Sequence, residues 1–87
     1  MDKKYTLPYG NIDSPSALGQ AVRAHRKQQG ATQADFASLC GVGVRFMSDL
    51  EKGKPTIELG KVLKVLQCLG VELSLHPRGW QRQASGR

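Results

Sequence analysis

Two histidines and two cysteines are the side chains of this sequence whose types are typical of metal binding or catalysis. His25 and His76 stand alone, because no further ligand lies near either one at the spacing of a metal site. Cys40 and Cys68 each lie inside an apolar pattern, so we expect two reduced, buried thiols rather than a metal or redox pair. The sequence has no glycine-rich phosphate loop, Ser/His/Asp set or paired acids. We therefore expect no metal, no cofactor and no enzymatic activity.

The charge balance indicates a polyanionic partner. The chain of 87 residues carries 13 Lys and Arg against 7 Asp and Glu, a net charge of +6, and this length forms one small domain. Charge alone does not separate nucleic acid from an anionic membrane. The longest apolar-rich stretch, residues 59–75, is interrupted by charges and glycines, and the N-terminus carries no apolar run. We therefore expect no membrane span and no signal peptide, and a cytoplasmic, nucleoid-associated protein.

Four helices are predicted between residues 14 and 70. Ser14 and Pro15 start the first, because serine caps free backbone N–H groups and proline is preset for the first helical position. The others are expected to begin after Thr32, at about Val44 and after Thr56. The residues that end the four helices are, in order, Gly30, the turn Cys40–Val42, Gly53 and Gly70.

The apolar spacing predicts which helix faces are buried. The second helix is expected to bury Phe36, Ala37 and Leu39. The apolar residues of the fourth helix cover more than one face, so more than one neighbour is expected to bury it. Those residues are Leu59, Val62, Leu63, Val65, Leu66 and Leu69.

Residues 71–75 alternate strictly between apolar and polar side chains, as a half-buried strand does. A single strand needs a partner, and no other segment is a convincing second strand. We predict that the same strand of a second copy pairs with it about a two-fold axis, with Val71, Leu73 and Leu75 in the dimer interface. The expected plan is an N-terminal arm (1–13), a helical domain (14–70), a dimerising strand (71–77) and a flexible basic tail (78–87).

The second and third predicted helices have the dimensions of a helix-turn-helix, whose second helix enters the major groove of DNA. The sequence resembles the lambda-repressor-like (Xre/Cro) helix-turn-helix family. The resemblance is carried by Arg26, residues 32–37 (Thr-Gln-Ala-Asp-Phe-Ala), Gly41-Val42 and residues 50–53 (Leu-Glu-Lys-Gly). It implies a mainly all-α domain of four to five helices, here with a short C-terminal strand paired across a homodimer.

Within that family the sequence is most similar to HipB-type antitoxins, the DNA-binding partners of HipA-like Ser/Thr kinase toxins. Three features support this similarity: residues 12–18 (Ile-x-Ser-Pro-Ser-x-Leu), the apolar helix that ends at Gly70, and the strand directly after it.

The resemblance places DNA contacts at five positions, Gln33, Gly43, Val44, Arg45 and Ser48, and the charge of Lys54 adds a sixth. Gln33 matches a phosphate-contacting glutamine, and its amide and the N–H groups of a helix N-terminus both suit a phosphate. Arg45 is the best base reader, because a guanidinium can bond O6 and N7 of guanine, which is worth about 1–3 kcal/mol of discrimination. Val44 can touch a thymine methyl, and Lys54 in the following loop can neutralise a phosphate. The predicted DNA-binding set is Gln33, Gly43, Val44, Arg45, Ser48 and Lys54.

Three residues depart from the family pattern. Gly43 stands where many relatives place a polar side chain, so a helix cap is lost. Phe46 is expected to pack rather than to face DNA. Asp49 would be repelled by phosphates, so we expect it to point sideways or to bond another side chain. The sequence therefore does not predict which bases the third helix prefers.

The resemblance also assigns two roles away from DNA. Arg26 and Glu51 match a family ion pair that ties the first helix to the third and holds the angle of the recognition helix, a task that suits the planar guanidinium. Trp80, the lone tryptophan in the basic tail, is a candidate contact with a toxin, with packing over the strand as the alternative.

These observations predict a homodimeric, sequence-specific transcriptional repressor. By resemblance it is the antitoxin of a type II toxin–antitoxin system, which neutralises a HipA-like kinase and represses its own operon. One alternative is a stand-alone Xre-family repressor without a toxin partner. A second is an interaction subunit that has lost DNA binding, which Gly43 and Asp49 favour but Gln33, Arg45 and the net charge of +6 oppose.

Overall fold

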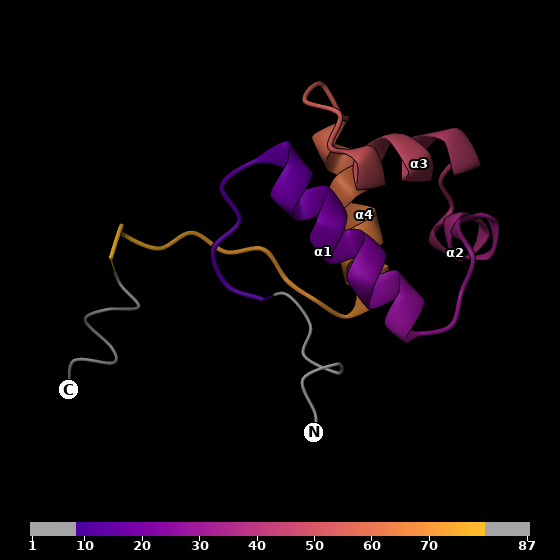
Figure 1. Ribbon diagram of the computed structural model, residues 1–87, viewed down its shortest axis with the longest axis horizontal. Helices are drawn as coiled ribbons and strands as arrows, with labels where there is room; N and C mark the ends of the chain where they lie inside the picture. Colours follow the sequence, from indigo (N-terminus) through magenta and orange to yellow (C-terminus); the bar gives the residue numbers. More distant parts are fainter. Residues whose placement is uncertain (1–8, 80–87) are drawn as a thin grey trace.

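The computed structural model describes residues 9–79 of the chain, which form four helices. These are α1 (Pro15–Gln28), α2 (Gln33–Cys40), α3 (Val44–Lys52) and α4 (Leu59–Leu69). In Figure 1, α1 crosses α4 at the centre, while α2 and α3 lie together on one side of this pair. The predicted mainly all-α class is thus confirmed. No helix of the described segment is long and apolar enough to cross a bilayer.

The helix ends follow local rules. The side chains of Ser14 and Thr32 accept hydrogen bonds of 3.0 Å from the backbone N–H groups of Ala17 and Asp35, so both predicted caps form. Gly53 ends α3 with a left-handed φ of 85°, and a Cβ atom there would lie 2.7 Å from the Cα of Ser16. Both its conformation and its close approach to α1 therefore require glycine.

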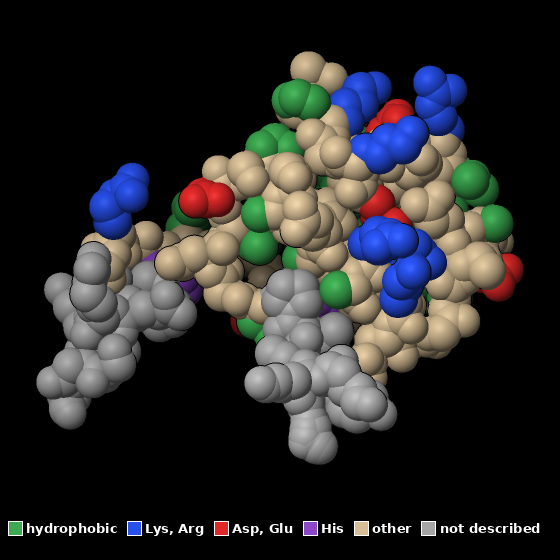
Figure 2. Space-filling model, in the orientation of Figure 1, with side chains coloured by type: hydrophobic (Ala, Val, Ile, Leu, Met, Phe, Trp, Pro, Cys, Tyr) green, Lys and Arg blue, Asp and Glu red, His purple; other side chains and the backbone are tan. Residues whose placement is uncertain are grey.

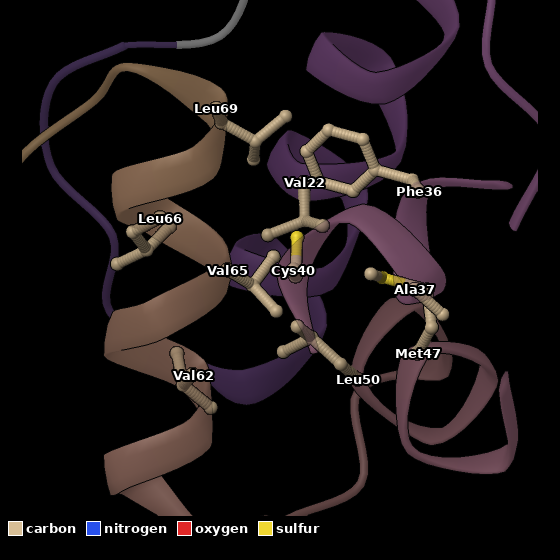
Figure 3. Packing of buried hydrophobic residues seen from close by; sticks show 10 residues of the cluster. All are labelled: Val22, Phe36, Ala37, Cys40, Met47, Leu50, Val62, Val65, Leu66 and Leu69. Atoms are coloured by element: carbon tan, nitrogen blue, oxygen red, sulfur yellow. The ribbon is translucent and has the colours of Figure 1, made fainter. Parts of the chain in front are cut away.

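The core lies where the four helices meet. Buried side chains from every helix pack in one cluster, shown in Figure 3: Val22, Phe36, Ala37, Cys40, Met47, Leu50, Val62, Val65, Leu66 and Leu69. At Gly19, α1 lies directly against the backbone of α3. A Cβ atom at Gly19 would clash with the backbone oxygen of Leu50 and would lie 2.7 Å from that of Glu51. This contact fixes the position of α3 on α1.

The fourth helix begins later than expected. We predicted that Thr56 caps it, but α4 starts at Leu59 with Glu58 at the N-cap position and no side-chain cap. The N–H of Ile57 donates to the carbonyl of Lys54 at 3.3 Å, so these residues form a turn with Thr56 at its exposed corner. Pro55 explains the difference, because its fixed φ favours the second position of such a turn.

Two predictions of buried apolar residues were wrong in part. Leu39 is 71% exposed, because the buried face of α2 is formed by Phe36, Ala37 and Cys40. Of the two cysteines, Cys40 is buried but Cys68 is exposed. The fourth helix packs against both α1 and α2, so the prediction of more than one neighbour is confirmed, but its Leu59 and Leu63 remain 59% and 42% exposed.

Residues 71–75 are extended and form no strand pairing within the described chain. The N–H of Val71 donates to the carbonyl of Leu66 at 3.1 Å, which closes the end of α4. Beyond it, Leu73 and Leu75 are 57% and 97% exposed. The predicted pairing across a dimer stays a prediction. The predictions for the first part of the N-terminal arm, for Trp80 and for most of the tail concern residues outside the described range.

Candidate nucleic-acid interface

The first residue of α2 is anchored to α3. The amide nitrogen of Gln33 donates a hydrogen bond of 2.9 Å to Oε1 of Glu51. An amide nitrogen carries two N–H groups, so the second one can still serve a phosphate. Because Gln33 begins α2, it stands beside backbone N–H groups at the positive end of the helix dipole. The geometry thus fits an anion contact whose direction is fixed by Glu51.

Glu51 also binds Arg26, in a buried ion pair between α3 and α1. The Nε and Nη2 atoms of the guanidinium donate to the two carboxylate oxygens at 2.7 and 2.9 Å, and Nη1 donates to the carbonyl of Ala31 at 2.7 Å. The side chains of Arg26 and Glu51 are only 7% and 3% exposed. The predicted partners are therefore in contact, and the pair joins α1, the loop before α2, and α3.

The electrostatics keep this network charged. Burial pushes the pKa of Glu51 upward, but hydrogen bonds from Arg26 and Gln33 and the positive charges of Arg26 and Arg23 outweigh burial, so the pKa is lowered. The hydrogen bond to Glu51 raises the pKa of Arg26. Both groups therefore stay ionised at neutral pH, and the bidentate geometry is maintained.

The N-terminal half of α3 is open to solvent. The side chain of Arg45 is 89% exposed, Val44 is 50% exposed and Ser48 is half-buried. Gly43, at the N-cap position, makes no side-chain cap, and a Cβ atom there would meet nothing within 4 Å. In Figure 2, Lys and Arg side chains gather over the half of the molecule formed by α1 and α3. This exposed, positive surface has the character that nucleic acid requires.

Two departures from the family pattern have a structural explanation. Phe46 is half-buried against the core, and the ammonium of Lys61 lies 5.7 Å from the centre of its ring. The carboxylate of Asp49 lies 3.7 Å from Nε of Arg45 and 3.6 Å from Nζ of Lys54. Asp49 thus bonds other side chains, and it connects two of the predicted DNA contacts.

Sequence reasoning did not foresee a groove on the side of α1 where the two chain ends run. It has a volume of about 830 Å³ and lies between residues 9–13, α1, the end of α4 and residues 71–79. Tyr9 lies over the buried His25 there, with ring centroids 4.8 Å apart in an edge-to-face arrangement. No periodicity marks residues 9–13, so the sequence held no signal for this packing.

The environment of Cys40 keeps its thiol protonated. Burial, followed by a hydrogen bond with the thiol of Cys68, raises the pKa of Cys40 to about 12, so Cys40 stays protonated. Within residues 9–79, no cluster of three or more His, Cys, Asp or Glu side chains is arranged to hold a metal ion.

Comparisons with known proteins agree with this geometry. An uncharacterised HTH-type transcriptional regulator of Sinorhizobium fredii, y4mF, is 46% identical over 72 residues, which are 83% of this chain and 95% of that protein. Antitoxin HipB of Escherichia coli (strain K12) is 29% identical over 69 residues, 79% of this chain and 78% of that protein. A chain in a solved HipA-HipB-O2-O3 complex superposes with a TM-score of 0.73 at 28% identity, covering 80% of this chain and 99% of that chain.

The family model described as a helix-turn-helix domain matches residues 17–78, which is more than half of the sequence. This range includes α2, α3, α4 and all of α1 except its first two residues, together with the anchored Gln33 and the exposed face of α3. The chain therefore belongs to the helix-turn-helix family of DNA-binding transcriptional regulators.

Proposed function

We propose that this protein is a homodimeric repressor that reads an operator with α3. The observation that carries the proposal is the contact of Glu51 with both Gln33 and Arg26, at 2.9 Å and 2.7 Å. This network holds α2 at a fixed angle to α3. Base reading needs such an angle, because the phosphate contacts of α2 set the depth at which α3 enters the major groove.

Each predicted contact has a separate task in this proposal. Arg45 reads a guanine through its terminal nitrogens, while Val44 touches a thymine methyl. Gly43 lets the backbone approach the DNA, and Ser48 supplies a hydroxyl one turn further along α3. Gln33 and Lys54 bind phosphates, so they contribute affinity that falls with salt but carries no sequence information.

The dimer is proposed to form through residues 71–77. In the single chain, Leu73 and Leu75 are 57% and 97% exposed, and Leu63 on α4 is 42% exposed. Pairing of this segment with its copy would satisfy its backbone groups and cover these side chains. The two copies of α3 would then meet half-sites roughly 34 Å apart, or a multiple of that distance, on a palindromic operator.

The antitoxin role rests on similarity to HipB. The 29% identity to antitoxin HipB and the fold match to a chain of the HipA-HipB-O2-O3 complex support a HipA-like kinase as partner. In this proposal the protein neutralises the kinase, represses their shared operon and acts in the cytoplasm at the nucleoid. It acts by binding alone, without catalysis, and Trp80 in the tail of residues 78–87 is the candidate toxin contact.

A stand-alone repressor is the second candidate. The similarity to y4mF favours it, because that protein is named as a transcriptional regulator alone. Both candidates bind DNA through the same surface, so the discriminating observation is a kinase partner.

The test is affinity capture of the full chain from native lysate, with and without nuclease, read by mass spectrometry. The antitoxin proposal predicts a HipA-like kinase that is retained after nuclease treatment. Capture of operator DNA without any kinase contradicts the antitoxin role and leaves the stand-alone repressor. A chain that captures neither contradicts both proposals.

A further inference from the structure

Asp49 lies within the helix that is proposed to face DNA, where a negative charge opposes binding. Its side chain is 22% exposed, and its two oxygens contact different cations. Oδ1 lies 3.7 Å from Nε of Arg45, one turn earlier on α3, and Oδ2 lies 3.6 Å from Nζ of Lys54, just beyond the helix.

The contact with Arg45 is made through Nε, and this determines what remains free. A guanidinium carries five N–H donors in a fixed plane, and the bidentate contact with guanine uses nitrogens at one edge of that plane. The ion pair with Asp49 is made through Nε and not through the terminal nitrogens, which are atoms that a bidentate contact with guanine can use. The side chain is 89% exposed, so little else in the fold limits its rotamers.

Both the backbone and the side chain of Lys54 contact Asp49. Its backbone N–H donates to the carbonyl of Asp49 at 3.0 Å, in the turn that Gly53 makes after α3. Its ammonium lies near the carboxylate of Asp49. Asp49 therefore contacts both the proposed base-reading side chain and the proposed phosphate-binding one.

We propose that Asp49 is a positioning residue for base recognition, which orients Arg45 toward a guanine and Lys54 toward the neighbouring phosphate. This inference rests on the proposed DNA-reading function of α3. A fixed Arg45 loses less rotamer freedom when it meets the correct base. The negative charge also lowers the affinity for every DNA sequence. Asp49 therefore reduces non-specific binding while it increases the difference in affinity between the correct and the wrong base.

The test uses the full chain with Asp49→Asn, which keeps the side-chain shape and removes the charge. The matched control is Asp13→Asn, which makes the same side-chain change at an exposed site in the segment before α1, outside the proposed DNA-binding and dimer-forming residues. Dissociation constants are measured by fluorescence anisotropy for a selected operator, for the same duplex with the guanine read by Arg45 replaced, and for a scrambled duplex. Circular dichroism on heating checks that each variant folds.

We expect Asp49→Asn to bind the scrambled duplex at least as tightly as the wild type does. Its preference for the guanine should fall by about tenfold, within the range of one bidentate base contact. In an Arg45→Ala background, Asp49→Asn should change the guanine preference no further, because Asp49 acts through Arg45. Asp13→Asn should leave the preference unchanged.

Three outcomes overturn the inference. An unchanged guanine preference in Asp49→Asn shows that Asp49 has only a general electrostatic effect. A further change in the Arg45→Ala background shows that Asp49 contacts a base itself. A wild-type chain that prefers no duplex overturns the proposed DNA-reading function, and this inference with it.

Discussion

Gln33 donates its amide N–H to Glu51 over 2.9 Å, so the first residue of α2 is bound to the second-to-last residue of α3. Glu51 in turn holds Arg26 of α1. One carboxylate therefore fixes the mutual angles of three helices. A helix-turn-helix depends on those angles, because its two DNA-contacting helices must meet the groove and the phosphates at the same time.

Loss of the Glu51 charge should destabilise the fold strongly. Glu51→Gln leaves the guanidinium of Arg26 buried at 7% exposure without its carboxylate partner. Breaking a buried pair from one side typically costs about 3–5 kcal/mol. Urea unfolding of the variant should show this loss.

The control is Glu58→Gln, which removes an exposed pair with Lys61 and should change the free energy of unfolding by less than about 1 kcal/mol. Equal stability of Glu51→Gln and wild type would contradict the account.

The same carboxylate predicts a dependence of stability on pH. The folded chain lowers the pKa of Glu51, so the unfolded chain binds more protons in the window between the lowered pKa and the ordinary value near 4.3. The stabilisation is complete above that ordinary value and is lost as pH falls through the folded pKa. Denaturation curves of the wild type and Glu51→Gln between about pH 7 and pH 3 should converge on the acid side. If the difference in stability between the two proteins stayed the same at every pH, the stabilisation by Glu51 would not depend on its protonation.

The crossing of α1 and α3 should not tolerate a methyl group at Gly19. A Cβ atom there would lie 2.7 Å from the backbone oxygen of Glu51, and backbone cannot rotate away as a side chain can. Gly19→Ala should therefore destabilise the chain by about 1–3 kcal/mol, as overpacking does. Gly43→Ala is the control, since open space surrounds that site. Thermal unfolding of both variants measures the difference, and a stable Gly19→Ala would disprove the close crossing.

Removal of residues 71–75 should produce monomers. These residues supply the exposed Leu73 and Leu75 to the proposed interface, whereas the buried core cluster ends at Leu69 and Val71 packs only against its outside. Sedimentation velocity of the deletion variant should give the mass of a single chain with an unchanged helical signal in circular dichroism. Leu39→Asn, at an exposed leucine on α2, should remain dimeric. A dimer that survives the deletion would reject the shared strand.

The parts of this fold that could be predicted from sequence depend on local rules. Ser14 and Thr32 cap their helices because a hydroxyl bonds the N–H three residues later, and Gly53 ends α3 because it adopts a left-handed conformation. The Arg26 and Glu51 contact followed from a family resemblance rather than from spacing.

The wrong predictions concern burial and a helix boundary, which depend on tertiary packing. Leu39 is apolar, but it lies outside the arc of α2 that meets the core, and the apolar flank of α4 finds no neighbour in one chain. The start of α4 was misplaced because a turn around Pro55 competes with the cap at Thr56. The division of the Asp49 oxygens between Arg45 and Lys54 depends on where the chain turns after α3, which no sequence pattern showed.

The central claim is that a dimer reads DNA with α3, and selection of binding sites from random duplexes by the full chain tests it most directly. The account predicts enrichment of a palindromic motif whose halves lie roughly 34 Å apart, or a multiple of that distance. Each half should contain a guanine whose preference disappears in Arg45→Ala, while Lys54→Ala weakens binding to all sequences alike and lowers the salt slope by about 1. Selection that yields no motif, or a motif unchanged in Arg45→Ala, would contradict the reading role of α3.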